Sequence, residues 1–265
     1  MFQTFRNAWK IEDLRKKILF TLFILLIYRL GAAIVVPFID AGTLQAQAQN
    51  SASIIPFFDL MTGGSFSNAT LFALGVTPYI NASIIIQLLQ VVIPALERWT
   101  KEGEEGRRKA NLVTRYTSIG ISLALSCMYY IYVNSQGGLM YTEGFGKWYA
   151  FAVIVMAFTA GAVLTMWLGE QIDAKGIGNG ISLLIFIGIV SNLANAIRQI
   201  IGYFSYAKEG LTWLYVAVPI IVLLFAAMFV LIVVVSAAER RIPVQYAKRV
   251  VGRKMYGGQA SNIPI

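Results

Sequence analysis

Six long apolar runs constrain this chain more than any other feature of its sequence. They lie at residues 18–36, 71–93, 112–133, 148–168, 181–201 and 213–235. Each is long enough for an α-helix to cross the hydrocarbon core of a bilayer, which takes about 20 residues. A helix is favoured there because it satisfies its own backbone polar groups where water is absent. With 57% hydrophobic residues among 265, the sequence predicts an all-α, multi-span integral membrane protein rather than a soluble domain.

Basic residues are distributed unevenly among the segments that join the six runs. Five precede the first run, six lie at the junction of the second and third, and six follow the last. The alternate junctions hold only Lys147, Arg198 and Lys208. Because cytoplasmic segments carry an excess of lysine and arginine, we expect both ends of the chain in the cytoplasm. We also expect residues 1–17 to form an amphipathic helix on the cytoplasmic membrane surface.

The residue types needed for common catalytic and metal sites are scarce. The sequence holds no histidine and one cysteine, Cys127, which lies within an apolar run. Histidine is the commonest metal ligand and a frequent general base, so its absence weighs against an enzyme. We interpret Cys127 as a small residue of the helix packing. We therefore expect no catalytic residue, no bound metal and no cofactor.

The segment between the first and second runs is unusual. It combines a polar stretch, residues 44–53, with an apolar piece, residues 54–64. The apolar piece is too short to cross a bilayer and too apolar for a free loop. Irregular backbone at membrane depth is tolerated only where protein or a water-filled cavity surrounds it. We therefore predict that residues 54–64 are buried, as a re-entrant segment or a capping helix.

Two stretches carry polar residues or glycines within otherwise apolar sequence. In residues 72–89, Gly75 and Pro78 lie three apart near an expected helix start, and small polar residues punctuate the run. By itself this pattern indicates a kinked span whose polar side chains hydrogen-bond neighbouring helices. In residues 167–185, a short charged turn with three glycines joins two apolar helices. Glycine permits backbone angles that other residues resist, so we expect a tight turn there.

In order and residue type, both stretches resemble signatures of the SecY family of protein-conducting channels. Two further stretches agree. Residues 28–40 resemble the end of the family's first helix, with Phe38 in place of the usual glycine, and residues 239–259 resemble the loop after its sixth helix. The resemblance covers the whole chain. It implies a SecY-like helical bundle with a re-entrant plug helix, of which this chain supplies six of the family's ten spans.

The resemblance also implies a division of the chain and three sites around an hourglass pore. Residues 18–201 would form spans one to five, residues 202–235 an outer loop and the sixth span, and residues 236–265 a basic cytoplasmic loop. Aliphatic side chains would close the pore waist in a ring: Val76, Ile80 and Ile185. A plug at residues 57–66 would seal the outer funnel: Phe57, Phe58, Asp59, Leu60, Met61, Thr62, Gly63 and Gly64. Polar residues would belong to a lateral gate: Thr77, Asn81, Ser83 and Gln87. Taken singly, each ring residue also suits lipid contact or packing, and the plug also suits a static cap.

The basic loops are the partner surface that the resemblance implies. In relatives the matching loops dock on ribosomal RNA and on the SecA motor, and the residues concerned here are Arg107, Arg108, Lys109, Arg240, Arg241, Lys248, Arg249, Arg253 and Lys254. Orientation in the membrane and attraction to anionic lipid would also explain these clusters. Further expected partners are SecE- and SecG-like small membrane subunits, signal peptides, nascent chains and the C-terminal half of the channel. The expected location is the bacterial cytoplasmic membrane, with the N-terminus in the cytoplasm.

The function implied is the pore subunit of the Sec protein translocase, which passes unfolded polypeptides across the membrane and apolar segments sideways into lipid. A secondary transporter is an alternative, because transporters also use broken helices. Such proteins usually carry ionisable residues at the midplane, whereas Arg29 is the one formal charge well inside a predicted run. A third possibility is an inactive piece or assembly intermediate that needs the C-terminal half. We expect that this chain alone does not conduct polypeptides.

Overall fold

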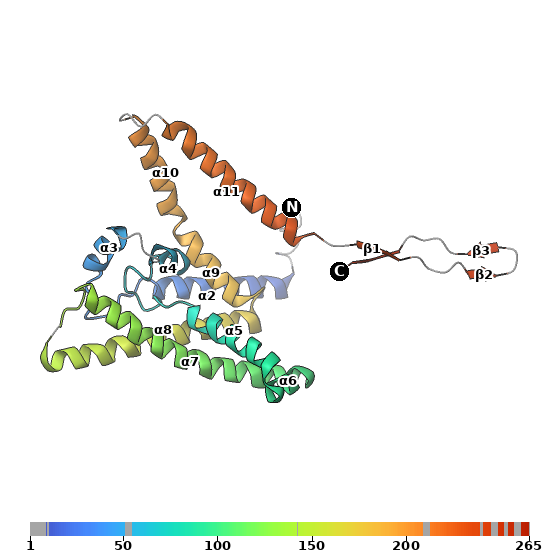
Figure 1. Cartoon of the computed structure of the whole chain (residues 1–265), viewed down its shortest axis with the longest axis horizontal. Coiled ribbons are helices and arrows are strands. Elements are labelled where there is room, and N and C mark those ends of the chain that lie inside the picture. The colour runs from blue at the N-terminus through green and yellow to red at the C-terminus, as the bar shows by residue number, and fades with distance from the viewer. Residues whose placement is uncertain are drawn as a thin grey trace. The chain divides into compact units, whose positions relative to one another are not determined.

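The computed structural model describes residues 9, 11–50, 55–141, 143–208, 213–238, 241–244, 249–251, 254–256 and 261–264. The chain divides into two units, Met1–Ala194 and Asn195–Ile265. Helices dominate the first unit and begin the second (Figure 1): α2 (Glu12–Gly31), α3 (Ala41–Asn50), α4 (Ile55–Thr62), α5 (Thr77–Val92), α6 (Pro94–Lys101), α7 (Glu104–Ser135), α8 (Gly144–Lys175), α9 (Gly180–Ser191), α10 (Leu193–Lys208) and α11 (Leu214–Ser236). The expected helical membrane bundle is confirmed over these helices, and the basic tail adds short strands.

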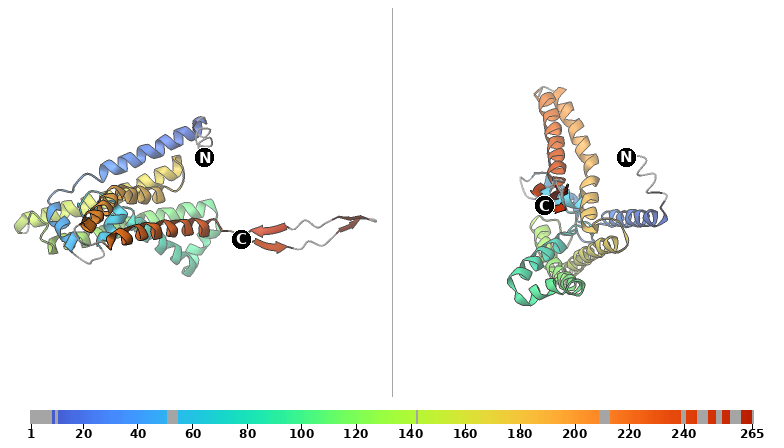
Figure 2. Two further views of the ribbon diagram at one scale, coloured as in Figure 1. Left: turned by 90° about the horizontal axis from the view of Figure 1, so that it is seen from above. Right: turned by 90° about the vertical axis from the view of Figure 1, so that its right-hand side faces the viewer.

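Helix α7 packs against both α5 and α8 in the first unit. Small residues recur at every fourth position of α7, at Thr114, Ser118, Ser122 and Ser126, and all four are buried. The Ser126 hydroxyl lies 3.1 Å from the Thr159 hydroxyl of α8. Small side chains let two membrane helices approach closely and pack over a long contact. In both Figure 1 and Figure 2, α7 and α8 accordingly run side by side.

The remaining helices of the first unit complete two apolar clusters. One forms around Tyr129, Val133 and Phe158 where α7 meets α8. The other joins α2, α8 and α9 through a second set of buried residues, which includes Ile24, Tyr28, Phe72, Val76, Leu168, Ile172 and Leu184. The rings of Tyr28 and Phe72 stack with their centroids 5.2 Å apart. These clusters hold the chain segment between α4 and α5 inside the unit.

Four helical stretches are long and apolar enough to cross a membrane, within the residues that the structure describes. They are Glu104–Ser135, Gly144–Lys175, Gly180–Ser205 and Leu214–Ser236. They correspond to the third to sixth predicted runs. The chain is therefore a multi-pass membrane protein.

The first two predicted runs differ from continuous spans. Helix α2 begins at Glu12, before the predicted start, and ends at Gly31, so residues 32–36 are not helical. Residues 71–76 form turns, and α5 starts only at Thr77. Gly75 has a φ of +52°, which a helix does not allow, and Pro78 lies in the first turn of α5. Proline is favoured there because the first helical N–H groups have no partner within the helix.

Helix α5 has 16 residues and extends for about 24 Å at 1.5 Å per residue, less than the hydrocarbon thickness of about 30 Å. The chain turns at Ile93 before α6 begins at Pro94. The expected amphipathic helix falls mostly on residues 1–8 and 10, outside the described residues. Residues 12–17 form the first turns of α2 and continue without a break into the first predicted span.

The second unit contains most of α10, all of α11 and the basic tail. The rings of Phe204 and Tyr215 lie with centroids 6.1 Å apart and join the two helices. Most side chains of α11 are exposed, as suits contact with lipid. In the tail, strand β1 (Arg241–Val244) pairs antiparallel with β4 (Ser261–Pro264), and β2 (Arg249–Val251) pairs with β3 (Lys254–Tyr256).

Candidate functional site

The three predicted ring residues lie in one apolar cluster. Val76 immediately precedes α5, Ile80 lies in the first turn of that helix, and Ile185 belongs to α9. Val76 is buried, and the partly buried Ile80 and Ile185 pack against the same group of side chains. The Val76 carbonyl accepts the Ile80 N–H at 3.1 Å. The fold thus brings together side chains that are more than 100 positions apart in the sequence.

The predicted plug consists of helix α4 followed by a glycine turn. The helix covers Ile55–Thr62, and Gly63 and Gly64 follow with φ of +70° and +85°. These left-handed angles stop the helix and suit glycine, which has no Cβ. Phe57 lies within α4, and its side chain is outside the described atoms. Of the other predicted plug residues, Leu60 is half exposed and Thr62 is buried.

Hydrogen bonds close this segment on itself. The Asp59 carboxylate accepts the Ser67 N–H and the Ser67 hydroxyl, each at 2.9 Å. The Thr62 hydroxyl donates to the Phe58 carbonyl at 3.0 Å and accepts the Phe66 N–H at 3.2 Å. Backbone groups that would otherwise be buried without partners are satisfied in this way. Residues 58–67 therefore form a defined unit rather than a loose loop.

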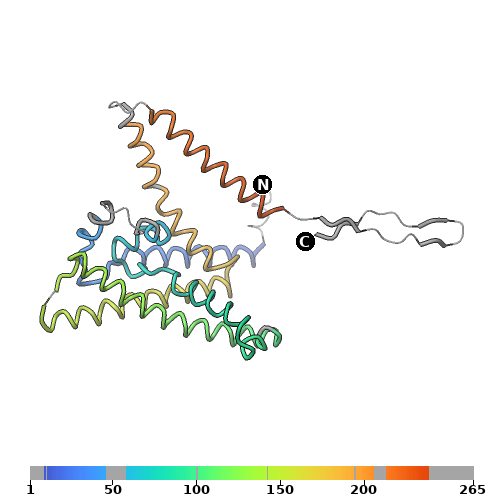
Figure 3. The backbone as a smooth tube through the Cα atoms, in the orientation of Figure 1, coloured from blue at the N-terminus to red at the C-terminus, as the bar shows by residue number. Residues whose placement is uncertain are grey.

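Helix α4, in the predicted plug segment, packs against α9, and the two backbone segments lie close together in the tube view (Figure 3). A Cβ added to Gly188 of α9 would lie 2.6 Å from the Met61 carbonyl oxygen, and one added to Gly63 would lie 2.8 Å from the Gly188 carbonyl oxygen. Both distances are shorter than real Cβ contacts, so the two backbones approach too closely for side chains. The Asn192 side-chain amide donates to the Asp59 carbonyl at 3.3 Å.

Helix α7 holds the other side of the segment. The Tyr129 hydroxyl donates to the Phe66 carbonyl at 2.6 Å, and the two rings meet edge to face at 4.8 Å. Sequence reasoning missed both Gly188 and Tyr129, because each reads as an ordinary residue of an apolar span. No local pattern marks Gly188, because the backbone that it meets, at Met61 and Gly63, lies more than 100 positions away in the sequence.

The four predicted gate residues divide between two cavities. Thr77 and Asn81 line a mainly apolar cavity of about 330 Å³, together with Phe58, Thr62 and Phe66 from the plug segment. Ser83 and Gln87 are hydrogen-bonded to each other at 3.3 Å. They line a second, more polar cavity of about 240 Å³, which also includes Trp99 and Arg107. The first pair thus lies beside the plug, and the second lies beside the basic loop.

The charged glycine turn between α8 and α9 is fixed by three side chains. Asp173 accepts the Gly180 N–H at 2.7 Å, and Asn179 caps α9 by accepting the Ser182 N–H at 3.0 Å. The Thr21 hydroxyl of α2 accepts the Ile177 N–H at 3.1 Å. The expected tight turn is confirmed, with Gly178 at a φ of +78°. It ties α9, which contacts the predicted plug segment, to α2 and α8.

The basic residues at the start of α7 are exposed. Lys109 forms an ion pair with Glu102 at 2.9 Å, and Arg107 and Arg108 lie beside it. On α6, a hydrogen bond from Lys101 lowers the pKa of the Glu97 carboxyl. The tail residues are described only in part. Arg240, Lys248 and Arg253 lie outside the described residues, and for Arg241, Arg249 and Lys254 only the backbone strands are described.

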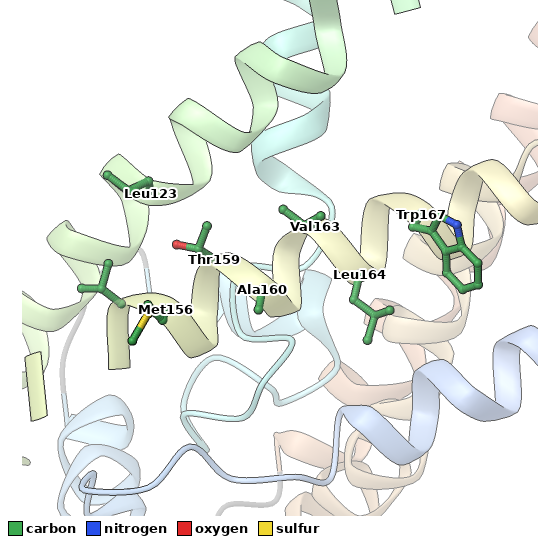
Figure 4. Close-up of a pocket in the computed structure, with 8 residues that line it drawn as sticks. Leu123, Met156, Thr159, Ala160, Val163, Leu164 and Trp167 are labelled. Carbon is green, nitrogen blue, oxygen red and sulfur yellow. The ribbon is translucent and has the colours of Figure 1, made fainter. Parts of the chain in front are cut away.

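A larger groove of about 570 Å³ runs along the surface of α7 and α8 (Figure 4). Figure 4 shows Leu123 of α7 above Met156 and Thr159 of α8, with Trp167 at the far end. Its lining is almost wholly apolar, and none of the predicted site residues lies on it. Such a face suits contact with lipid chains better than it suits chemistry.

Known proteins are similar to this chain over its whole length. A family model described as SecY matches residues 70–265. The protein translocase subunit SecY of Thermus thermophilus is 42% identical over 272 residues, which cover 100% of this chain and 60% of that protein. The same subunit of Bacillus subtilis is 40% identical over 272 residues, with 100% and 61% covered. The chain thus spans about 60% of the length of the curated relatives it matches.

Solved structures show the same fold. The chain is similar to "The structure of a protein conducting channel", with a TM-score of 0.58, 22% sequence identity and coverage of 95% of this chain and 52% of that one. It is also similar to "Sec61 in the Canine ribosome-channel complex from the endoplasmic reticulum", with a TM-score of 0.54, 22% identity and coverage of 88% and 50%. At this level of identity the likeness bears on the fold alone.

Proposed function

This chain belongs to the SecY family, and from that premise we propose that it forms part of the pore subunit of a protein translocase. The pore passes unfolded polypeptides across the membrane and releases apolar segments sideways into lipid. The observation that carries the proposal is the seating of the plug segment on α9, beside the cluster that holds Val76, Ile80 and Ile185. The residues that we propose as gate, seal and constriction thereby belong to one unit.

The constriction would work by excluding water. A narrow ring of aliphatic side chains dewets and blocks ions, yet such side chains can part around an extended peptide. The partial burial of Ile80 and Ile185 supports this role, because neither is locked deep within the core. The plug would close the same path from one side.

Sideways release would follow from partitioning. A central leucine or isoleucine favours the membrane by about 0.3–0.6 kcal/mol on insertion scales, so a long apolar run prefers lipid to the pore. Weakly polar gate residues suit a helix surface that must separate from a neighbouring helix when the gate opens. The hydrogen bond between Ser83 and Gln87 lies within α5, so it would survive that separation. A hydrogen bond between membrane helices contributes only about 0.6 kcal/mol on average.

This chain would act with partners and without catalysis of its own. The exposed basic residues at the start of α7 would favour binding of ribosomal RNA, because counterions are released when they pair with phosphates. They would also attract anionic lipid. We further propose the SecA motor, SecE- and SecG-like subunits, signal peptides, nascent chains and the rest of the channel as partners. The charge bias favours a cytoplasmic N-terminus in the bacterial cytoplasmic membrane. Energy for movement would come from the motor or the ribosome.

Site-specific photo-crosslinking tests the pore assignment. A photoreactive amino acid is placed at Ile80 or Ile185, in membranes that also supply the C-terminal part of a SecY relative, and a translocating chain is arrested. We expect crosslinks from both positions to the arrested chain. Met156, exposed on α8, is the matched control and should crosslink to lipid instead. Equal crosslinking from all three positions would contradict the proposal. Substrate-coupled proton or sodium flux would favour a transporter.

A further inference from the structure

Phe38 adopts a backbone conformation that L-residues avoid. Its φ is +69°, in the left-handed region where a Cβ is disfavoured. Bulky residues persist there only when the surroundings impose the conformation. The surroundings here are hydrogen bonds to the loop between α7 and α8. The Phe38 carbonyl accepts the Met140 N–H at 3.1 Å, and the Gly138 carbonyl accepts the Asp40 N–H at 2.9 Å.

The Phe38 ring also contacts two aromatic side chains near the loop between α7 and α8. It meets the ring of Tyr141 at 5.6 Å and the ring of Tyr149 at 5.8 Å, both edge to face. Tyr141 belongs to the α7–α8 loop, and Tyr149 belongs to the first turns of α8. Edge-to-face pairs are favourable beyond the area they bury. The strained residue therefore links the segment after α2 to the tip of the α7–α8 hairpin.

The same hairpin tip exposes further large aromatic side chains. Phe145 is 87% exposed, Trp148 72%, Tyr149 57% and Tyr141 51%. In water such a patch would be unfavourable. Both α7 and α8 are long and apolar enough to span a membrane, and a spanning pair would place the tip near the end of the hydrocarbon. Tryptophan and tyrosine favour that depth because their rings are apolar and their tips are polar. Lys147, in the first turn of α8, adds a positive charge next to lipid phosphate.

We propose that Phe38, Tyr141, Phe145, Trp148 and Tyr149 form an aromatic collar that anchors this end of the hairpin at the boundary between phospholipid headgroups and acyl chains. The left-handed Phe38 is part of the anchor, because its ring ties residues 37–40 to the collar. The occupant of this surface is lipid rather than a protein partner. Its exposed residues continue the exposed apolar surfaces of two spanning helices, and the positive charge of Lys147 is opposite to that of phosphate.

Spin-label depth measurement tests the collar. The full chain with Cys127→Ala carries a single new cysteine, labelled with a nitroxide, in vesicles of phosphatidylcholine and phosphatidylglycerol. In the collar, the label replaces Phe145 or Trp148. The two control labels replace Met156 in the middle of α8 and Glu105 at the water-exposed start of α7. Collisions with oxygen report lipid, and collisions with a water-soluble nickel chelate report water. We expect both collar labels to give values between the two controls. Values equal to either control would overturn the proposal.

Three substitutions at Phe38 test its part in the anchor. Phe38→Tyr keeps the ring and should leave the depth of the Trp148 label unchanged. Phe38→Ala removes the ring and keeps the strain, whereas Phe38→Gly removes both. We expect each of these two to raise nickel accessibility at the label several-fold, while circular dichroism shows unchanged helix content. An unchanged label depth in Phe38→Gly would overturn the role of Phe38. The glycine variant keeps the test decisive if the alanine variant fails to fold, because glycine accepts the positive φ of this position without strain.

Discussion

The glycine contact between the plug segment and α9 makes a sharp prediction about Gly188. Replacing it with alanine adds a Cβ that would lie 2.6 Å from the Met61 carbonyl oxygen. The atom it meets is backbone, which cannot rotate away as a side chain can. The plug segment must therefore move off α9. The hydrogen bond from Asn192 to the Asp59 carbonyl, already 3.3 Å long, should lengthen with it.

The size of the effect follows from the cost of overpacking. Forcing extra atoms into a tight contact costs about 1–3 kcal/mol. Since every 1.4 kcal/mol changes an equilibrium about tenfold, the ratio of seated to unseated plug should fall by roughly 5- to 150-fold. The hydrogen bond from Tyr129 to the Phe66 carbonyl remains. We therefore expect a displaced plug segment rather than an unfolded unit.

Thiol accessibility measures this displacement. Ser65 in the plug segment is only 1% exposed, so Ser65→Cys in a Cys127→Ala background reports on the unseated state. Alkylation by a water-soluble maleimide should speed up in proportion to the unseated fraction, because only that state exposes the thiol. The matched control is Gly120→Ala on α7, where an added Cβ meets nothing within 4 Å. If Gly188→Ala and Gly120→Ala are alkylated at the same rate, the glycine contact does not seat the plug.

Three further predictions concern the same unit. Tyr129→Phe removes the 2.6 Å hydrogen bond to the plug segment but keeps the ring, so thermal unfolding in detergent should show a loss of about 0.6–1.7 kcal/mol; no change would mean that the bond is not formed. Ser122→Leu places a large side chain at a position 1% exposed between α7 and α8. It should destabilise the pair by about 1–3 kcal/mol or more, whereas Ala124→Leu on the exposed face should be neutral in the same assay. The hydrogen bond from Lys101 lowers the pKa of Glu97, so its contribution to α6 exists at neutral pH and disappears as the pH falls through that lowered value. Carboxyl NMR titration should show Lys101→Gln returning the pKa of Glu97 upward, and an unchanged value would contradict this.

Much of the fold is predictable from local sequence because the physics is local. A bilayer requires about 20 apolar residues in a helix, so the third to sixth runs indicate their spans directly. Proline in a first helical turn and glycine at positive φ have effects confined to a few residues. Gly75 and Pro78 therefore marked the start of α5, and the glycines after Met61 marked the end of α4. The prediction of continuous helices over the first two runs was wrong, because hydrophobicity alone does not distinguish a helix from an apolar turn buried in protein.

The site depended on information that a single run of sequence does not contain. The resemblance to a family suggested Val76, Ile80 and Ile185, but only the folded chain shows that they share one apolar cluster with residues of α2, α8 and α9. A glycine such as Gly188 is unremarkable until another backbone is found 2.6 Å from its missing Cβ. In the sequence, Phe38 is only a replacement for the family's usual glycine. Its positive φ and its two aromatic neighbours are known only from the structure. Hydrophobicity, charge and turn residues act within a few positions of the chain, so they determined the spans and their ends. Close contacts between segments far apart in sequence exist only after folding, so the tertiary structure alone decided the contact of Gly63 with Gly188 and the ring contacts of Phe38.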